Sequence, residues 1–122
     1  MGQRVVHFEI TADDPRRAVE FYSKTFGWEF NSWGGPETYF LASTGKDVPG
    51  IDGAVTERFE HGQPIVNTIG VESYEDAAQR VRANGGQVIQ DKQAIPGVGW
   101  FSYCRDTEGN VFGIMQPDES AR

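Results

Sequence analysis

The chain is poor in cysteine and has no long apolar run. Cys104 is the one cysteine among 122 residues, so an internal disulfide is excluded, as is usual in a reducing cytoplasm. No apolar run approaches the roughly 20 residues of a membrane span, and residues 1–9 lack the apolar stretch of a signal peptide. We therefore expect a cytoplasmic protein with no membrane partner.

Basic residues are also scarce. Eleven Lys and Arg stand against 18 Asp and Glu, which gives a net charge of −7. No local cluster of Lys and Arg compensates, so we expect no nucleic-acid partner. The 38% apolar and 12% aromatic content can supply the core of a single domain without a structural metal.

Two stretches of the chain look like degraded copies of one another. At an offset of 59 the pairs that match are Ile10 with Ile69, Ala18 with Ala77, and Gly27 with Gly86. At an offset of 56, Gly53-Ala54-Val55 lines up with Gly109-Asn110-Val111. These offsets predict two like modules with a cavity where they meet. They match His7 with Val66, and Glu57 with Gly113.

The first module, residues 1–60, is predicted to contain a strand, a helix and three more strands. Val5–Ile10 alternates as a strand does. Asp13-Asp14-Pro15 supplies an acidic N-cap and a first-turn proline for a helix, and Gly27 ends it. The strands that follow are Trp28–Ser32, Glu37–Ala42 and Ile51–Phe59, the first two separated by a turn at Gly34-Gly35-Pro36.

The second module, residues 65–116, follows a linker at residues 60–64 and repeats that order. Ile65–Val71 is predicted as a strand, and Ser73 as the N-cap of a helix that ends at Asn84-Gly85-Gly86. The remaining predicted strands are Gln87–Gln90, Trp100–Cys104 and Val111–Gln116. Residues 95–99 are expected to be loop, and the polar tail, residues 117–122, to be frayed.

The predicted fold class is α+β, with two βαβββ modules and a cupped, mostly antiparallel sheet around a cavity. One helix for four strands can cover only one sheet face, so the opposite face lines the cavity. Strand alternation then assigns the lining. It comprises His7, Glu9, Val55, Glu57, Val66, Thr68, Val111, Gly113 and Met115.

Two runs resemble a known family. The opening run VVHFEITADDPRRAVEFYSKTFGWEF is similar to the first module of the vicinal oxygen chelate superfamily, which includes glyoxalase, bleomycin-resistance proteins and extradiol dioxygenases. The closing run IPGVGWFSYCRDTEGNVFGIMQ resembles the last hairpin of the same superfamily. The resemblance implies the two-module fold and a homodimer.

The resemblance also implies four metal-ligand positions, on the first and fourth strands of each module. His7 occupies the first position and Glu57 the second, whereas the third and fourth fall on Val66 and Gly113. Val and Gly have no coordinating side chain, and catalytic metals usually have three or more protein ligands. We therefore predict that the family metal site is incomplete.

His7, Glu9 and Glu57 are the candidate polar site residues. His7 titrates near neutrality, and Glu9 lies on the same strand face two residues later. These two side chains either contribute to a metal site of histidine and carboxylates or hydrogen-bond in a polar cavity, and we favour the second alternative. Glu57 is either a buried general base or an exposed acid.

Aromatic side chains are the second signal for a ligand site. Trp33, Tyr39, Trp100 and Tyr103 lie on or beside predicted strands, where they can line a small-molecule pocket or pack in a core. With Glu9 and Met115 they are the predicted ligand contacts.

Three functions remain open. The first is binding of a small apolar or aromatic molecule in the cavity, with the metal lost and no cofactor. The second is a divalent-metal-dependent lyase or dioxygenase that uses His7 and Glu57. The third is a dimeric interaction module whose cavity is vestigial.

Overall fold

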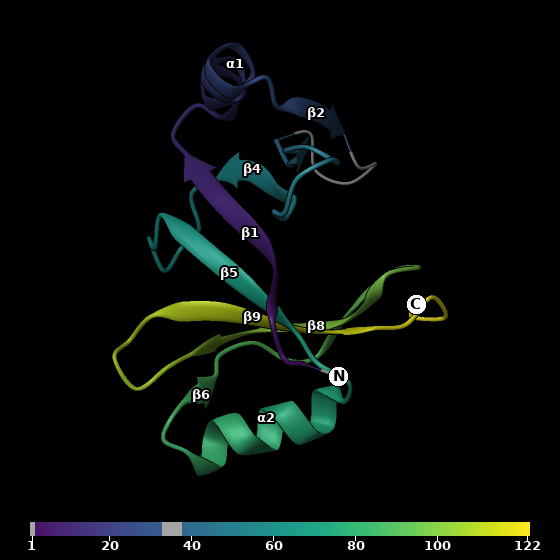
Figure 1. Cartoon of the computed structure of the whole chain (residues 1–122). Coiled ribbons are helices and arrows are strands. Elements are labelled where there is room, and N and C mark those ends of the chain that lie inside the picture. The colour runs from purple at the N-terminus through teal and green to yellow at the C-terminus, as the bar shows by residue number, and fades with distance from the viewer. Residues whose placement is uncertain (1, 33–37) are drawn as a thin grey trace. The chain divides into compact units, whose positions relative to one another are not determined.

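The computed structural model describes residues 2–32 and 38–122 and contains two compact units. One unit is His7–Val66. The other joins the residues before His7 to Asn67–Arg122. Each unit combines strands with one helix (Figure 1). The predicted fold class, α+β with two βαβββ modules, is confirmed.

The unit His7–Val66 has a mixed four-stranded sheet. Its strands lie in the order β2-β3-β4-β1, with β1 and β4 parallel and the other neighbours antiparallel. The elements are β1 (Val5–Ala12), α1 (Pro15–Phe26), β2 (Glu29–Ser32), β3 (Phe40–Ser43) and β4 (Gly53–Glu57). The predicted Trp33, the turn after it and Glu37 lie outside the described residues.

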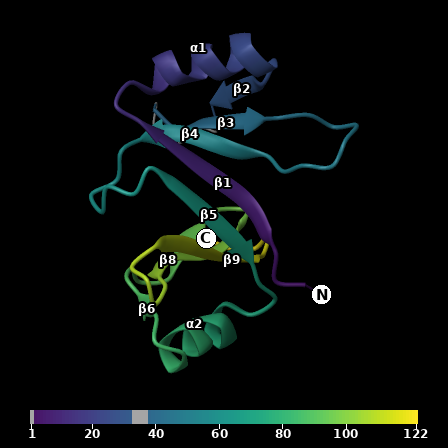
Figure 2. The same ribbon diagram turned by 60° about the vertical axis from the view of Figure 1, so that its left-hand side comes forward.

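Helix α1 begins and ends as its sequence predicts. The Asp14 carboxylate accepts a hydrogen bond from the Arg17 N–H, and Gly27 has the left-handed φ of 76° that ends a helix. The helix lies beside this sheet (Figure 2). Tyr22 of α1 stacks on Trp28 at 4.9 Å between ring centroids, and Trp28 lies 5.8 Å from Phe8. Phe8 therefore marks the helix-covered face of β1.

The second unit has strand order β5-β9-β8-β6, with β7 also paired to β8. Ser73 caps α2 as predicted, since its hydroxyl accepts from the Asp76 N–H. The short strand β7 was not predicted. The elements are β5 (Ile65–Gly70), α2 (Tyr74–Ala83), β6 (Gln87–Val88), β7 (Gln93–Ile95), β8 (Gly99–Arg105) and β9 (Val111–Pro117).

The core of this unit lies between α2 and one face of β8 and β9. Tyr74 and Ala78 of α2 pack with Cys104 and Ile114. Inside this core the hydroxyl groups of Tyr74 and Ser102 are 2.6 Å apart. Burial raises the pKa of the Cys104 thiol to about 11, with a smaller opposing effect of Arg82. The thiol is therefore a packing group and not a thiolate nucleophile at neutral pH.

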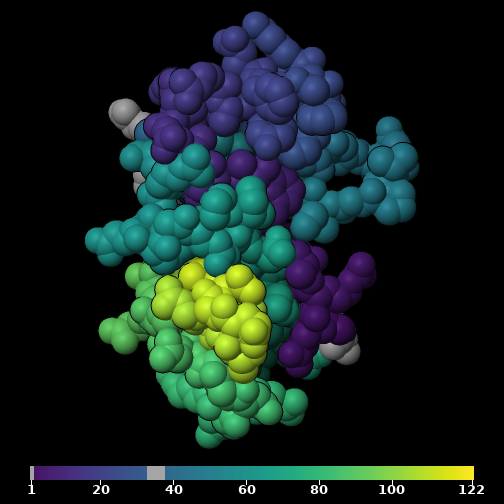
Figure 3. Space-filling model, turned by 90° about the vertical axis from the view of Figure 1, so that its left-hand side faces the viewer, coloured from purple at the N-terminus to yellow at the C-terminus, as the bar shows by residue number. Residues whose placement is uncertain are grey.

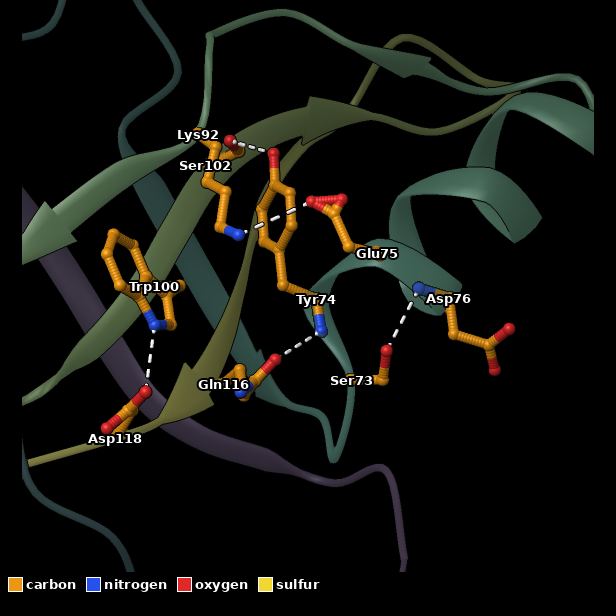
Figure 4. A network of polar contacts seen from close by, with 9 residues as sticks. All are labelled: Ser73, Tyr74, Glu75, Asp76, Lys92, Trp100, Ser102, Gln116 and Asp118. Atoms are coloured by element: carbon orange, nitrogen blue, oxygen red, sulfur yellow. Dashed lines mark hydrogen bonds and ion pairs between the residues drawn. The ribbon is translucent and has the colours of Figure 1, made fainter. Parts of the chain in front are cut away.

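The prediction of a frayed tail is wrong. Ala121 is completely buried, and its carbonyl accepts a hydrogen bond from the Gly97 N–H. Asp118 donates its N–H to the Val98 carbonyl and accepts at its carboxylate from Trp100 Nε1 at 3.0 Å (Figure 4). The turn before β8 presents backbone groups that need partners, and the tail satisfies them.

A long loop between β3 and β4, residues 44–52, projects from the surface (Figures 2 and 3). Its two ends are joined by Thr44, whose N–H donates to the Asp52 carboxylate at 2.8 Å. The Thr44 hydroxyl also donates to the Ile51 carbonyl at 2.7 Å. These bonds fix the point at which the chain enters β4.

Candidate functional site

The register of the parallel strand pairs is the same in both modules. Glu9 pairs with Ala54 in the first module, and Thr68 pairs with Gly113 in the second. In each pair the partners are 45 residues apart. The offset of 59 that relates the first strands therefore also relates the fourth strands, and the predicted offset of 56 is wrong.

With the offset of 59, each residue on the fourth strand of the first module matches a different residue of the second module than predicted. Gly113 corresponds to Ala54, and Glu57 corresponds to Gln116. A shift of three residues is odd, so it also reverses which side chains share a sheet face. The first and fourth strands of each module were predicted close to where they lie, but the offset that relates the two fourth strands was not.

Glu57 lies on the opposite sheet face from His7. Its register partner is Ala12, which shares its side of β1 with Phe8 and Ile10, the face that α1 covers. Glu57 is exposed, and its carboxylate accepts from the Thr38 hydroxyl. The predicted shared site of His7 and Glu57 is therefore wrong. Val55, the register partner of Ile10, also faces the helix side.

His7, Tyr39 and Glu9 form a hydrogen-bonded chain on the other face. Tyr39 donates its hydroxyl proton to Glu9 Oε2 at 2.8 Å, and His7 Nε2 lies 3.2 Å from the same hydroxyl oxygen. Because that hydroxyl has only one proton, its contact with His7 requires Nε2–H as the donor. The neutral imidazole then keeps a lone pair on Nδ1 that can accept a proton or a hydrogen bond.

Burial and neighbouring charges keep the His7 imidazole neutral and the Tyr39 hydroxyl protonated. Burial lowers the pKa of His7 below its ordinary 6.5, opposed by the charges of Glu9 and Asp52. The pKa of Tyr39 is raised far above its usual range, first by burial and then by the charge and hydrogen bond of Glu9. At neutral pH, therefore, His7 is neutral and Tyr39 is protonated.

Asp52 is a member of this site that sequence reasoning missed. It precedes Ala54 by two residues, and Ala54 is the register partner of Glu9, so Asp52 aligns with the His7 and Glu9 face. Thr44 holds its carboxylate through the N–H and the hydroxyl, at 2.8 and 3.2 Å. Strand alternation assigns Asp52 to this face only once the register of β4 against β1 is known.

Arg58 contacts Thr11 at the far end of the same face. Arg58 donates to the carbonyl and hydroxyl oxygens of Thr11 at 3.1 and 3.0 Å. It also forms an ion pair with Asp13 at 3.1 Å. Its charge is therefore compensated by a carboxylate at the edge of the face.

The equivalent face of the second module is packed and mostly apolar. Thr68 and Val111 are buried, and Phe101 corresponds to Tyr39. A Cβ atom on Gly113 would lie 2.7 Å from the Phe101 ring and 3.0 Å from Thr68 Oγ1. The place of the predicted fourth metal ligand is therefore filled by an aromatic ring.

The side chains do not fit the metal ion of the family. Val66, Ala54 and Gly113 have no donor atom, and Nε2 of His7 is hydrogen-bonded to Tyr39. Among residues 2–32 and 38–122, no group of three or more His, Cys, Asp or Glu side chains could hold a metal ion. The donor chemistry is that of a hydrogen-bonding site.

The predicted ligand contacts of the second unit, Trp100, Tyr103 and Met115, divide between the two faces of its sheet. Trp100 packs on the face covered by α2, and Lys92 Nζ lies over its ring, 4.8 Å from the ring centroid. The same ammonium lies 5.3 Å from the Tyr74 ring and 3.4 Å from Glu75 (Figure 4). Trp100 therefore contacts the protein's own lysine and does not join Tyr103 and Met115, which lie on the opposite face of β8 and β9.

Residues 4–114 match the family model of the Glyoxalase/Bleomycin resistance protein/Dioxygenase superfamily. The chain belongs to this superfamily. A glyoxylase-like domain-containing protein of Didymella fabae is 32% identical over 114 residues, which cover 87% of this chain and 88% of that protein. The putative glyoxylase CFP32 of Mycobacterium tuberculosis is 28% identical over 116 residues, 89% of this chain but only 42% of CFP32.

Solved structures of the superfamily share the fold. A superfamily member from Vibrio splendidus has a TM-score of 0.69 at 18% identity, covering 94% of this chain and 99% of that one. A variant methylmalonyl-CoA epimerase of Streptomyces coelicolor, in complex with 2-nitronate-propionyl-CoA, has a TM-score of 0.71 at 17% identity, with 98% of both chains covered. At these identities the likeness establishes the fold and not the activity. Among the described residues, neither helix has the length and apolar character needed to cross a membrane.

Proposed function

We propose that this superfamily member binds a small molecule at the polar sheet face of the unit His7–Val66, without the metal ion of the family. The site consists of His7, Tyr39, Glu9 and Asp52. The observation that carries the proposal is the hydrogen-bonded chain from His7 through Tyr39 to Glu9. A buried carboxylate that orients a tyrosine and a neutral histidine is a costly arrangement, and such arrangements are concentrated at functional sites.

In this proposal His7 and Tyr39 contact the ligand directly, because both are half-buried, whereas Glu9 is only 4% exposed and acts through Tyr39. His7 Nδ1 accepts a hydrogen bond from a ligand hydroxyl or amine. With its lowered pKa, the same nitrogen can serve as a general base near neutral pH. Leu41, 38% exposed, is the register partner of Ala54 and offers apolar contact on this face.

The loss of the metal is part of the proposal. It is supported by the absence of donor atoms at Ala54, Val66 and Gly113 and by the Phe101 ring beside Gly113. Protein purified without chelators should contain far less than one equivalent of Ni, Zn, Fe or Mn per chain by plasma mass spectrometry. A stoichiometric metal that disappears in His7→Ala would overturn this part.

The binding experiment is titration of the ¹⁵N-labelled protein with a panel of small aromatic alcohols and amines, followed by NMR. We expect shift changes at His7, Tyr39 and their strand neighbours, and their loss in His7→Ala. The matched control is Glu57→Gln, which changes a carboxylate on the opposite face of the same sheet. Binding that weakens equally in both variants would contradict the proposed site.

The homodimer expected from the family resemblance is also a proposal. Light scattering on the purified protein should give twice the chain mass of 13.5 kDa. A monomeric mass would remove the dimer without affecting the ligand site, since every residue of that site belongs to one unit of one chain.

A further inference from the structure

A groove lies on the helix side of the unit His7–Val66, on the opposite sheet face from the site proposed above. Its volume is about 290 Å³, which is at the lower end of the range for small-molecule pockets. Helix α1 supplies one wall and β3 supplies the other. The residues that line the groove are Arg16, Val19, Glu20, Ser23, Lys24 and Phe40.

The backbone explains why these side chains meet. The residues from α1 recur at intervals of three and four, so they form one stripe that extends roughly 12 Å along the helix. Phe40 is the register partner of Val55, and Val55 is that of Ile10, so the Phe40 ring points to the sheet face that α1 covers. The groove therefore shares no side chain with the polar site and is separate from it.

Arg16 is the one cation of the groove that has no counterion within the part of the chain that the structure describes. Its guanidinium carbon lies over the Phe40 ring, 5.4 Å from the ring centroid. This cation–π contact uses none of the N–H donors. The Arg16 side chain forms no ion pair or hydrogen bond with the described residues. Its N–H donors are therefore available to an acceptor that enters the groove.

The other two charged side chains of the groove compensate one another. Lys24 Nζ lies 3.1 Å from the Glu20 carboxylate, one helical turn away. Both side chains are exposed, and ion pairs as exposed as this one are weak. With two basic side chains and one carboxylate, the lining of the groove carries one net positive charge, and that charge belongs to Arg16.

The charges at the start of α1 do not cancel the charge of Arg16. Asp13 forms an ion pair with Arg58, and Asp14 accepts a hydrogen bond from the Arg17 N–H as the helix N-cap. Arg17 adds a further positive charge, and its exposed side chain does not line the groove. Around the groove basic side chains therefore outnumber acidic ones by one, although the whole chain has a net charge of −7.

From these observations we infer that the groove is a second ligand site, which binds small organic anions that carry a carboxylate on an aromatic body. The carboxylate accepts two N–H bonds from Arg16, an arrangement that the planar guanidinium group favours. The aromatic body lies in the groove against Val19 and Phe40. Because the contact with Phe40 already restrains the guanidinium group, less conformational entropy is lost when a ligand binds.

The test uses two probes of nearly equal shape, 2-naphthoate and the neutral 2-naphthamide, titrated separately into the ¹⁵N-labelled full chain and followed by NMR. We expect saturable shift changes at the amides of Val19, Ser23 and Phe40. The carboxylate should bind about tenfold more tightly than the amide, because its hydrogen bonds to Arg16 are charge-assisted. Since the groove is open to solvent, this preference should shrink in ~0.5 M salt.

Two arginine variants on α1 separate the groove from the general charge of the helix. Arg16→Gln should weaken the binding of 2-naphthoate about tenfold and leave that of 2-naphthamide nearly unchanged. Arg17→Gln is the matched control, because it removes the same charge one residue further along, outside the groove, and should leave both affinities nearly unchanged. Glu20→Gln removes the carboxylate of the groove and should tighten the binding of 2-naphthoate about twofold.

Each contrary outcome overturns the inference in a different way. Equal losses in Arg16→Gln and Arg17→Gln would assign the binding of 2-naphthoate to the overall charge of the helix. Equal affinities of the two probes would show that the groove does not select anions. Shift changes that do not saturate by about 10 mM, or that centre on His7 and Tyr39, would show that the groove is not a site. None of these outcomes contradicts the proposed function, because its site lies on the opposite sheet face.

Discussion

The two modules have the same strand register and opposite chemistry on the corresponding faces. In the first module this face carries His7, Glu9 and Tyr39 in one hydrogen-bonded chain. In the second module the matching positions are Val66, Thr68 and Phe101, all of which are buried. Register is set by backbone geometry and turn lengths, so it survives substitution of side chains on one face. The two modules of a duplicated fold can therefore keep the same strand register while only one of them has polar side chains on this face.

The comparison also explains why the metal positions are asymmetric. In the first module a histidine is present but is held by Tyr39. In the second module the corresponding space is occupied, since Phe101 packs against the backbone of Gly113. Close packing of this kind leaves no vacancy into which a ligand side chain could be restored.

The largest effect is expected from Gly113→Ala in the packed face. The new methyl group would lie 2.7 Å from the Phe101 ring and 3.0 Å from Thr68 Oγ1. Overpacking of this kind costs about 2 kcal/mol in the free energy of unfolding, measured by denaturant titration. Gly50→Ala is the matched control, because its methyl group would meet no atom within 4 Å. Equal stability of the two variants would show that the second module is not packed at this point.

A smaller effect is expected from Tyr39→Phe in the polar face. The change removes the donor to the buried Glu9 carboxylate and the acceptor of the His7 Nε2–H. Loss of a hydrogen bond to a charged group costs about 1.5 kcal/mol. Tyr22→Phe, on a ring that stacks with Trp28, should change stability by less than about 0.5 kcal/mol. A Tyr39→Phe variant as stable as Tyr22→Phe would mean that the chain from His7 to Glu9 contributes nothing to folding.

The smallest effect is a pH dependence contributed by His7. Since burial lowers its pKa in the folded protein below the unfolded value of 6.5, unfolding takes up a proton as the pH falls below about 6.5. The contribution of His7 to stability is therefore complete above pH 6.5 and is lost progressively down to the folded pKa. Denaturation midpoints of wild type and His7→Gln across this window give the difference. Parallel curves would contradict the lowered pKa.

Several elements could be predicted from local sequence alone. Asp14 and Ser73 cap the two helices, and Gly27 ends the first, because capping depends on residues three or four positions apart. The shared face of His7 and Glu9 follows from strand alternation. In contrast, alternation along the fourth strand could not decide which of its two faces is shared with His7, and the face assumed for Glu57 was the wrong one.

Other parts of the molecule were beyond local reasoning. The polar composition of residues 117–122 predicted a frayed end, yet Ala121 is buried because backbone groups at Gly97 and Val98 need partners. Trp100 beside a glycine-rich turn was expected at a ligand site, but strand alternation in β8 places it against α2. Asp52 could not be separated from other loop carboxylates without the pairing of Glu9 with Ala54.

The sequence by itself determined the duplicated order of strands and helices, the helix caps and the presence of a histidine and a glutamate on one side of the first strand. These are properties of spacing along the chain, which side-chain alternation and capping chemistry fix locally. Only the tertiary structure decided which distant residues join them, with Tyr39 and Asp52 included and Glu57 excluded. The pairing of β1 with β4 sets that choice, because the phase between two strands is a property of their hydrogen bonds and not of either sequence alone.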